Sequence, residues 1–494
     1  MKKNIYRLFL LPLLLLNLTA CEDFLDKNPQ GTTTQESFPT TTEDAILATN
    51  AVYSSVREWF YHSGGFPIAD IMSDDAYKGS NPGDAAATVG AFDKFNHTAD
   101  IGLLDNWWNA LYEGIKRANV VIDYVPEVSM NTELQNRLIG EARFLRALFY
   151  FDLVRAWGGV QLVETTTPSF NLPKSSPEAV YDFIEADLLA AIPLLTEKSE
   201  LSAGDAGRAT KGAARALLAK VYLFQGDFPN AEKYALEVIN SNQYDLEEDF
   251  ADANSVEGEN GVESIFEVGA LQITSTEGGG NQYANTQGVR GVPNKGWGFN
   301  RPSIDLREAF EPGDVRQDAT IIELGEVIDG IEILGDDGTP NNYDNGYAIE
   351  IESYNQKVWV PGETTISNFG HNRRLIRYAD VLLMAAEALN ENNKPGDALV
   401  QLNKVRERAR GGDETILPDI TETDKEALRN IILNERRVEL AMEGHRFWDL
   451  VRTGLAAEVL GPLGFIEGQH ELLPIPQNQI DLSQGNLEQN DNWN

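Results

Sequence analysis

The sequence predicts a mainly α fold, in which paired helices form a scaffold and a loop-rich lobe carries short β-strands. Apolar residues recur at helical spacing in two long stretches, about 43–240 and 373–455. The stretch between them, 245–370, is rich in Gly, Asn and Asp. Hydrophobic residues make up 42% of the 494 residues and charged residues 24%, so the composition is that of a globular protein.

The N-terminus predicts a lipoprotein signal peptide over residues 1–20. A basic end with Lys2, Lys3 and Arg7 precedes the apolar run 8–16, and the only cysteine, Cys21, follows small residues. This run is too short to span a bilayer, which takes about 20 residues. The pattern resembles a bacterial lipobox, which implies cleavage before Cys21 and diacylation of its thiol. The alternative is a free cysteine behind an ordinary signal peptide.

The helical stretches contain units of two helices each. Residues 214–239 read "ARALLAKVYLFQGDFPNAEKYALEVI", in which one apolar stripe ends at "QGDFPN" and a second begins after it. Small residues such as Ala219 and Ala231 allow two helices to approach closely, as in tetratricopeptide repeats. Residues 379–409 repeat the pattern, and 104–157 looks like a degenerate copy. We interpret these stripes, together with Trp107 and Trp108, as core packing.

The middle stretch predicts short strands between turns. "ESIFEV" and "YAIEIESY" are β-like runs, and "SIDLREAF" predicts a helix capped by Ser303. The acidic loop 335–346 offers Asp336, Asp337, Asn341 and Asp344, which are suitable oxygen ligands for a structural Ca²⁺. It lacks the EF-hand spacing, so a solvated acidic loop is the alternative.

Charge and motifs exclude several classes of function. The formal net charge of −37 and the lack of a basic stripe argue against nucleic-acid binding. The five histidines form no HExxH motif, and neither a G-x-S-x-G elbow nor a P-loop is present. We therefore expect no catalytic residues, no cofactor beyond that possible calcium ion, and no enzyme activity.

Six stretches occur in a fixed order along the chain: "CEDFLDKNPQG" (21–31), "EARFLRALFYFDLVRAWGGVQLV" (141–163), "LIRYADVLLMAAEAL" (375–389), "NERRVELAMEGHRFWDLVRTG" (434–454), "LLPIPQNQI" (472–480) and "LEQN" (487–490). Together they resemble the SusD/RagB family of outer-membrane glycan-binding lipoproteins of Bacteroidetes. The ending "LEQNDNWN" departs from the Pro-Gly that often follows Gln-Asn in that family. The resemblance also implies that the charged motif 434–454, which includes Trp448, is structural.

The resemblance implies a SusD-like protein that is anchored in the outer membrane, exposed at the cell surface, and docked on a SusC-like TonB-dependent transporter. Its function would be to capture a polysaccharide or oligosaccharide for import. We expect a lipidated tether at 21–42, an N-terminal helical part at 43–244, a variable lobe at 245–370 and a C-terminal helical part and tail at 371–494. The last would form one compact unit with 43–244.

Aromatic residues on irregular backbone mark the candidate glycan site. Sugar rings stack on aromatic planes, and their hydroxyls bind amides, carboxylates and guanidinium groups. In "NKGWGFNRP" (294–302), glycines flank Trp297 and disfavour a regular helix or strand. The candidate glycan-binding residues are Trp297, Tyr283, Phe299, Asn281, Asn300, Arg301, Trp359, Tyr77 and Trp59. For each ring, burial in the core is the alternative.

The acidic surface favours a neutral glycan, for example a β-glucan, over alginate or a sulfated polysaccharide. The rival function is a peptide-binding lid of an oligopeptide importer, which would need partners for an extended backbone. Clustered Trp and Tyr beside Asn favour sugar over peptide.

Overall fold

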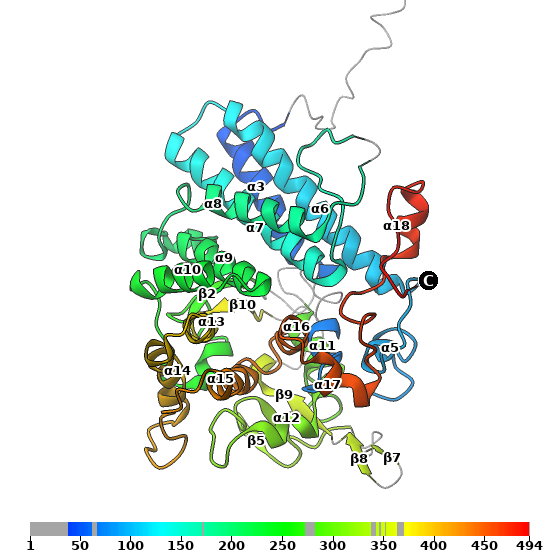
Figure 1. The fold of residues 1–494 in the computed structure, drawn as a ribbon, viewed down its shortest axis with the longest axis vertical. Helices are drawn as coiled ribbons and strands as arrows, with labels where there is room; N and C mark the ends of the chain where they lie inside the picture. The colour runs from blue at the N-terminus through cyan, green and yellow to red at the C-terminus, as the bar shows by residue number, and fades with distance from the viewer. Residues whose placement is uncertain are drawn as a thin grey trace, which may run out of the picture.

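A computed structural model describes residues 38–61, 67–169, 172–271, 282–336, 342–344, 347–350, 352–362 and 370–493. Cys21 and Asn281 lie outside these residues, so the predictions made for them stay predictions. The fold is mainly helical, as predicted (Figure 1). No helix in the described part of the chain is both long and apolar enough to cross a membrane.

The scaffold consists of long helices that pack largely against their neighbours in the sequence. They are α3 (Thr42–Val56), α6 (Gly102–Tyr124), α7 (Thr132–Trp157), α8 (Pro177–Ala191), α9 (Lys211–Gln225), α10 (Phe228–Asn240), α13 (Tyr378–Glu391), α14 (Pro395–Ala409) and α15 (Lys425–Glu439). The predicted helix pairs are present as α6 with α7, α9 with α10, and α13 with α14. In Figure 1, α3, α6, α7 and α8 gather at one end of the molecule, and α12 and β9 lie toward the other.

Shorter helices complete the fold. They are α5 (Val89–Asp93), α11 (Tyr283–Gln287), α12 (Ile304–Ala309), α16 (Arg446–Arg452), α17 (Ala456–Leu460) and α18 (Gln477–Leu482). Ser303 caps α12 as predicted, because its hydroxyl accepts a hydrogen bond from the Leu306 N–H at 2.9 Å.

The described strands form two-stranded antiparallel sheets. They pair as β1 (Ala76–Gly79) with β3 (Phe299–Pro302), β2 (Ser264–Val268) with β10 (Arg373–Arg377), β4 (Ile321–Glu323) with β9 (Ser353–Asn355), β5 (Val327–Ile328) with β6 (Ile331–Glu332), and β7 (Asn342–Asp344) with β8 (Tyr347–Glu350). The pairing of β1 with β3 joins an N-terminal segment to the middle of the chain. This pairing positions the candidate site described below.

One large core runs through the scaffold. It contains Trp107, Trp108 and Trp448, whose burial was predicted. Helices α6 and α7 approach so closely that a Cβ at Gly114 would lie 2.5 Å from the Phe149 ring. The two helices can therefore pack this closely only because residue 114 has no side chain.

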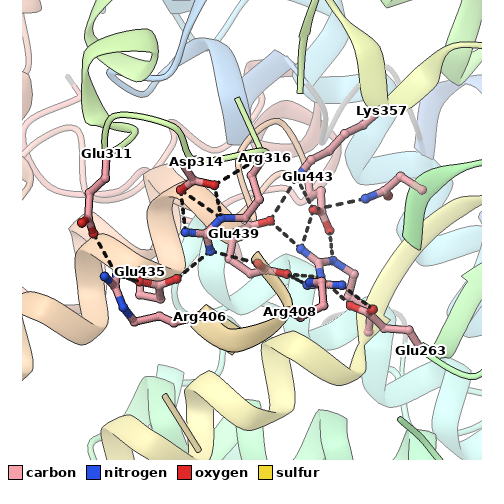
Figure 2. Close-up of polar contacts among 12 residues, drawn as sticks. Glu263, Glu311, Asp314, Arg316, Lys357, Arg406, Arg408, Glu435, Glu439 and Glu443 are labelled. Carbon is pink, nitrogen blue, oxygen red and sulfur yellow. Dashed lines mark hydrogen bonds and ion pairs between the residues drawn. The ribbon is translucent and has the colours of Figure 1, made fainter. Parts of the chain in front are cut away.

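A buried ionic network fastens α14 and α15 to segments of the middle region (Figure 2). Glu439 of α15 is fully buried, and its carboxylate accepts hydrogen bonds from Arg316, Arg377 and Arg408. The adjacent acid Glu435 binds Arg316 at 2.6 Å. The prediction that this motif is structural agrees with these contacts, in which Glu435 and Glu439 bind arginines from other segments.

Candidate functional site

Trp297 lies on irregular backbone, as the flanking glycines predict. The backbone N–H of Trp297 donates to the backbone carbonyl oxygen of Asn285 at 2.8 Å, and this hydrogen bond holds the loop against α11. A Cβ at Gly296 would lie 2.3 Å from that same oxygen, and Gly298 has a φ of +70°. The loop can therefore follow this path only with glycine on both sides of the indole.

The indole of Trp297 is half-buried, and it meets Trp59 from the segment after α3. The two ring centroids are 5.9 Å apart and the ring planes form an angle of 72°. This edge-to-face contact is the favoured geometry of an aromatic pair. Two rings that the sequence separates widely thus form one aromatic corner.

Phe299 adds a third, half-exposed ring beside Trp297. It begins β3 and lies opposite Gly79 of β1. The Lys78 ammonium lies 5.6 Å from the centre of the Phe299 ring and donates to the carbonyl oxygens of Gly79, Asn81 and Asp84. These contacts tie the segment after β1 to the wall of the site.

The polar wall of the site is organised by Arg290. Its guanidinium binds Asp336 at 2.7 Å, Asp84, and the hydroxyl of Ser80 at 2.6 Å. Arg290 therefore joins its own loop to the segment after β1 and to Asp336. The hydrogen bond from Arg290 lowers the pKa of Asp84 and keeps this carboxylate ionised. Burial opposes the charge of Arg290, but the two carboxylates outweigh it and raise the pKa of the guanidinium.

These groups surround an open groove of about 450 Å³, which we call the Trp297 groove. Its lining residues are Ser80, Asp84, Arg290, Gly291, Asn294, Gly296, Trp297, Phe299 and Asp336. Aromatic faces can stack on the C–H faces of a ligand, while the guanidinium, carboxylates and amide can bind its hydroxyls. The groove therefore combines apolar planes with fixed polar groups, as small-ligand sites do.

Three of the predicted contact residues are buried, so the prediction of exposed side chains is wrong for them. Tyr283 is 8% exposed, Asn300 0% and Arg301 1%. The Asn300 amide donates to Asp70 at 3.0 Å and to Gln287 at 2.9 Å. Asn300 and Arg301 face the interior because strand β3 is packed between β1 and β9, and Tyr283 of α11 packs against Val358 and Val360. Residue type alone does not reveal this burial.

Two further predicted residues are half-exposed but do not line the groove. The hydroxyl of Tyr77 accepts a hydrogen bond from the Ile304 N–H at 3.3 Å. The indole N–H of Trp359 donates to Asp329 at 2.6 Å, and the Lys295 ammonium lies 4.4 Å from the centre of its ring. The structure thus places Trp297 and Phe299 in the lining of the groove and Trp59 against Trp297, and it leaves Tyr77 and Trp359 outside the lining.

Sequence reasoning missed Arg290 and Asp84 and assigned Asp336 to another role. The sequence offered Asp336 as one suitable oxygen ligand for Ca²⁺, with a solvated acidic loop as the alternative, and in the structure the Arg290 guanidinium lies beside this carboxylate. Asp337 and Asn341 lie outside the described residues, as does the Asp344 side chain. Among the side chains that the structure describes, no group of three or more His, Cys, Asp or Glu could hold a metal ion.

Comparison with known proteins extends over nearly the whole chain. The profile described as "SusD family" matches residues 262–493, and the one described as "Starch-binding associating with outer membrane" matches residues 23–223. The chain is 30% identical to SusD-like protein P2 of Formosa agariphila, and the alignment covers 94% of this chain and 95% of the relative.

Two solved structures share the fold. A "Laminarin binding SusD-like protein" is 31% identical with a TM-score of 0.78, and the match covers 92% of this chain and 100% of that structure. Surface glycan-binding protein A from Bacteroides thetaiotaomicron, in complex with laminarihexaose, is 25% identical with a TM-score of 0.76. That match covers 91% of this chain and 100% of that structure.

Proposed function

The chain belongs to the SusD/RagB family, and from this premise we propose that it is a glycan-binding protein whose binding site is the Trp297 groove. The observation that carries the proposal is that Trp297, which Trp59 contacts, and Phe299 line one groove with a polar wall built on Arg290. The rings would stack on successive sugar rings, and the polar groups would select hydroxyl orientation. Because the loop is fixed by its hydrogen bonds and glycines, binding would need little ordering of the protein.

A neutral glycan, such as a β-glucan, fits the groove best. Among the described lining residues, Arg290 alone is cationic and is already paired with Asp84 and Asp336, so this part of the lining carries a net negative charge. A sulfated or uronic-acid polymer would be repelled there. Laminarin and laminarihexaose, which name the two similar structures, carry no charged groups.

We propose a binding function and no catalysis. A glycosidase needs a carboxylic acid whose pKa is raised so that it can donate a proton. In the groove, Arg290 instead lowers the pKa of Asp84 and pairs with Asp336. Both carboxylates are thus suited to accept hydrogen bonds from a ligand.

The location and the partner follow from the family as parts of the same proposal. A lipid on Cys21 would anchor the protein in the outer membrane with its groove at the cell surface, and a SusC-like TonB-dependent transporter would receive the captured glycan. The description of the profile that matches residues 23–223 supports an association with the outer membrane.

The test is affinity electrophoresis of the soluble chain in gels that contain neutral or anionic polysaccharides. We expect a neutral glucan to retard the wild type, and Trp297→Ala to weaken binding by about 2 kcal/mol, or about 30-fold. Tyr181→Ala serves as a control, because this half-buried aromatic lies on α8 and lines no part of the groove.

Equal retardation of folded Trp297→Ala and wild type would refute the Trp297 groove as the site. If no polysaccharide retards the wild type and calorimetry with oligopeptides shows binding, the peptide-binding rival is correct. Retardation by anionic polymers alone would contradict the neutral substrate class.

A further inference from the structure

A small, partly open cavity of about 60 Å³ lies in the middle of the molecule, away from the Trp297 groove. Its walls come from helices α6, α7, α9 and α16 and from strand β10, so it lies where the helical scaffold meets the middle region. Figure 1 shows α16 at the centre of the fold. The volume suits one or two small species, because a water molecule occupies about 30 Å³ in the liquid.

Arg373 lines this cavity, and its buried guanidinium has no ion-pair partner in contact with it among the residues that the structure describes. The residue is only 9% exposed. Within the described ranges, it makes no ion pair within 4.0 Å and no hydrogen bond, and its Nε is enclosed without an acceptor. Its contact is with the Tyr283 ring, whose centre lies 5.2 Å away. A buried and unpaired charge costs several kcal/mol, so an anion is expected nearby.

The other charges of the cavity are already balanced. Asp152 pairs with Arg155, and Glu443 accepts hydrogen bonds from Lys357 and Arg377. A separate pair joins Lys220 of the cavity wall to Asp380 at 2.7 Å.

The positive charge of Arg373 also interacts electrostatically with the carboxylate of Asp70. Its oxygens accept from the Asn300 amide at 3.0 Å and from the Gly444 N–H at 2.8 Å, and Asp70 does not line the cavity. Of the charged groups in the described cavity wall, Arg373 is therefore the one without an ion-pair partner in contact.

The cavity also has more hydrogen-bond donors than acceptors. The indole N–H of Trp107 is enclosed, and no acceptor for it is found in the part of the chain that the structure describes. His445 lines the same cavity, and burial, assisted by the charge of Lys220, lowers its pKa to about 3. A neutral imidazole keeps one N–H donor and adds no positive charge.

We propose that this cavity binds one small monovalent anion, of the size of chloride, as the counter-ion of Arg373. One negative charge matches the one unpaired guanidinium, and 60 Å³ is too small for a sugar ring or a phosphate ester. The bound ion would link β10 to the helices around it. It would thus stabilise the junction between the scaffold and the middle region without taking part in glycan capture.

The direct test is crystallography of the protein grown without chloride and soaked in sodium bromide. An anomalous difference map should show a bromide peak within hydrogen-bond distance of the Arg373 guanidinium in the wild type and in Arg373→Lys. The peak should be absent in Arg373→Met, which keeps most of the side-chain volume but loses the charge. A map whose bromide peaks lie only at the protein surface would overturn the proposal and assign water to the cavity.

A second test uses thermal unfolding at matched ionic strength in sodium chloride and in sodium gluconate, whose anion is too large for the cavity. Chloride should raise the Tm of the wild type by about 2–4 °C, because it binds only the folded state. Arg373→Met should lose this rise. An equal rise in both proteins would mean that chloride acts elsewhere, and the proposal would be wrong.

Discussion

Replacing Glu439 with glutamine is expected to destabilise the fold by about 3–5 kcal/mol. The carboxylate is fully buried and binds three guanidinium groups, with distances of 3.1 Å to Arg316 and 2.6 Å to Arg377 and a close contact with Arg408 (Figure 2). Glutamine keeps the shape but removes the negative charge. Removing one partner from a buried ionic group typically costs this amount, because the remaining charges stay buried without compensation.

The assay is equilibrium unfolding in urea, followed by far-UV circular dichroism, for the wild type, Glu439→Gln and the control Glu407→Gln. Glu407 lies on the neighbouring helix α14 and is exposed, so its substitution should change stability by less than about 0.5 kcal/mol. Glycan binding by the fraction of Glu439→Gln that remains folded should match the wild type, because Glu439 does not line the Trp297 groove.

A loss below about 1 kcal/mol for Glu439→Gln, close to that of the control, would refute the reasoning. It would mean that water or relaxation compensates the three guanidinium groups. Loss of glycan binding in a fully folded variant would also contradict it, because the network would then contribute directly to the site.

Three further predictions concern the groove and the effect of pH. Gly296→Ala should weaken glycan binding several-fold, because the new Cβ would lie 2.3 Å from the Asn285 oxygen; isothermal titration calorimetry measures this, and unchanged affinity would contradict it. Burial alone would raise the pKa of Glu443, but Arg377 and Lys357 outweigh it and lower the pKa to about 2. The stabilisation by the ionised Glu443 carboxylate is therefore complete above about pH 5 and is lost as the pH falls from about 4.5 to 2. The Tm difference between wild type and Glu443→Gln should shrink over that range, and a constant difference would disprove the lowered pKa of Glu443. Burial raises the pKa of Asp70 from 3.8 to about 6, so ionisation of this carboxyl lowers the stability of the wild type as the pH rises from about 4 to 6; over that range the Tm difference between wild type and Asp70→Asn should therefore shift in favour of the variant, and a constant difference would count against it.

Local patterns in the sequence were enough to predict the paired helices and one helix cap. The apolar stripes of 214–239 and 379–409 correspond to α9 with α10 and α13 with α14, and Ser303 caps α12. These features depend on residues within one or two turns of each other, so they can be predicted from spacing alone. The six ordered motifs identified the family for the same reason, because each is read within a short segment of chain.

The candidate site could be predicted only in part. The irregular backbone at Trp297 followed from its flanking glycines, and the aromatic content of the loops suggested a sugar site. The sequence could not show that the amide of Asn300 is buried, because an asparagine has the same polarity whether it lies in the interior or at the surface. It also could not pair Asp336 with Arg290, because Arg290 stands 46 positions earlier in the chain.

By itself, the sequence determined which segments are helical and where glycine frees the backbone, because these properties depend on neighbouring residues. Only the tertiary structure decided which side chains meet. Trp59 contacts Trp297, and Glu439 of α15 contacts Arg316, because strand pairing and helix packing bring distant segments together. The groove is a product of those non-local contacts, and its chemistry could be described only once they were known.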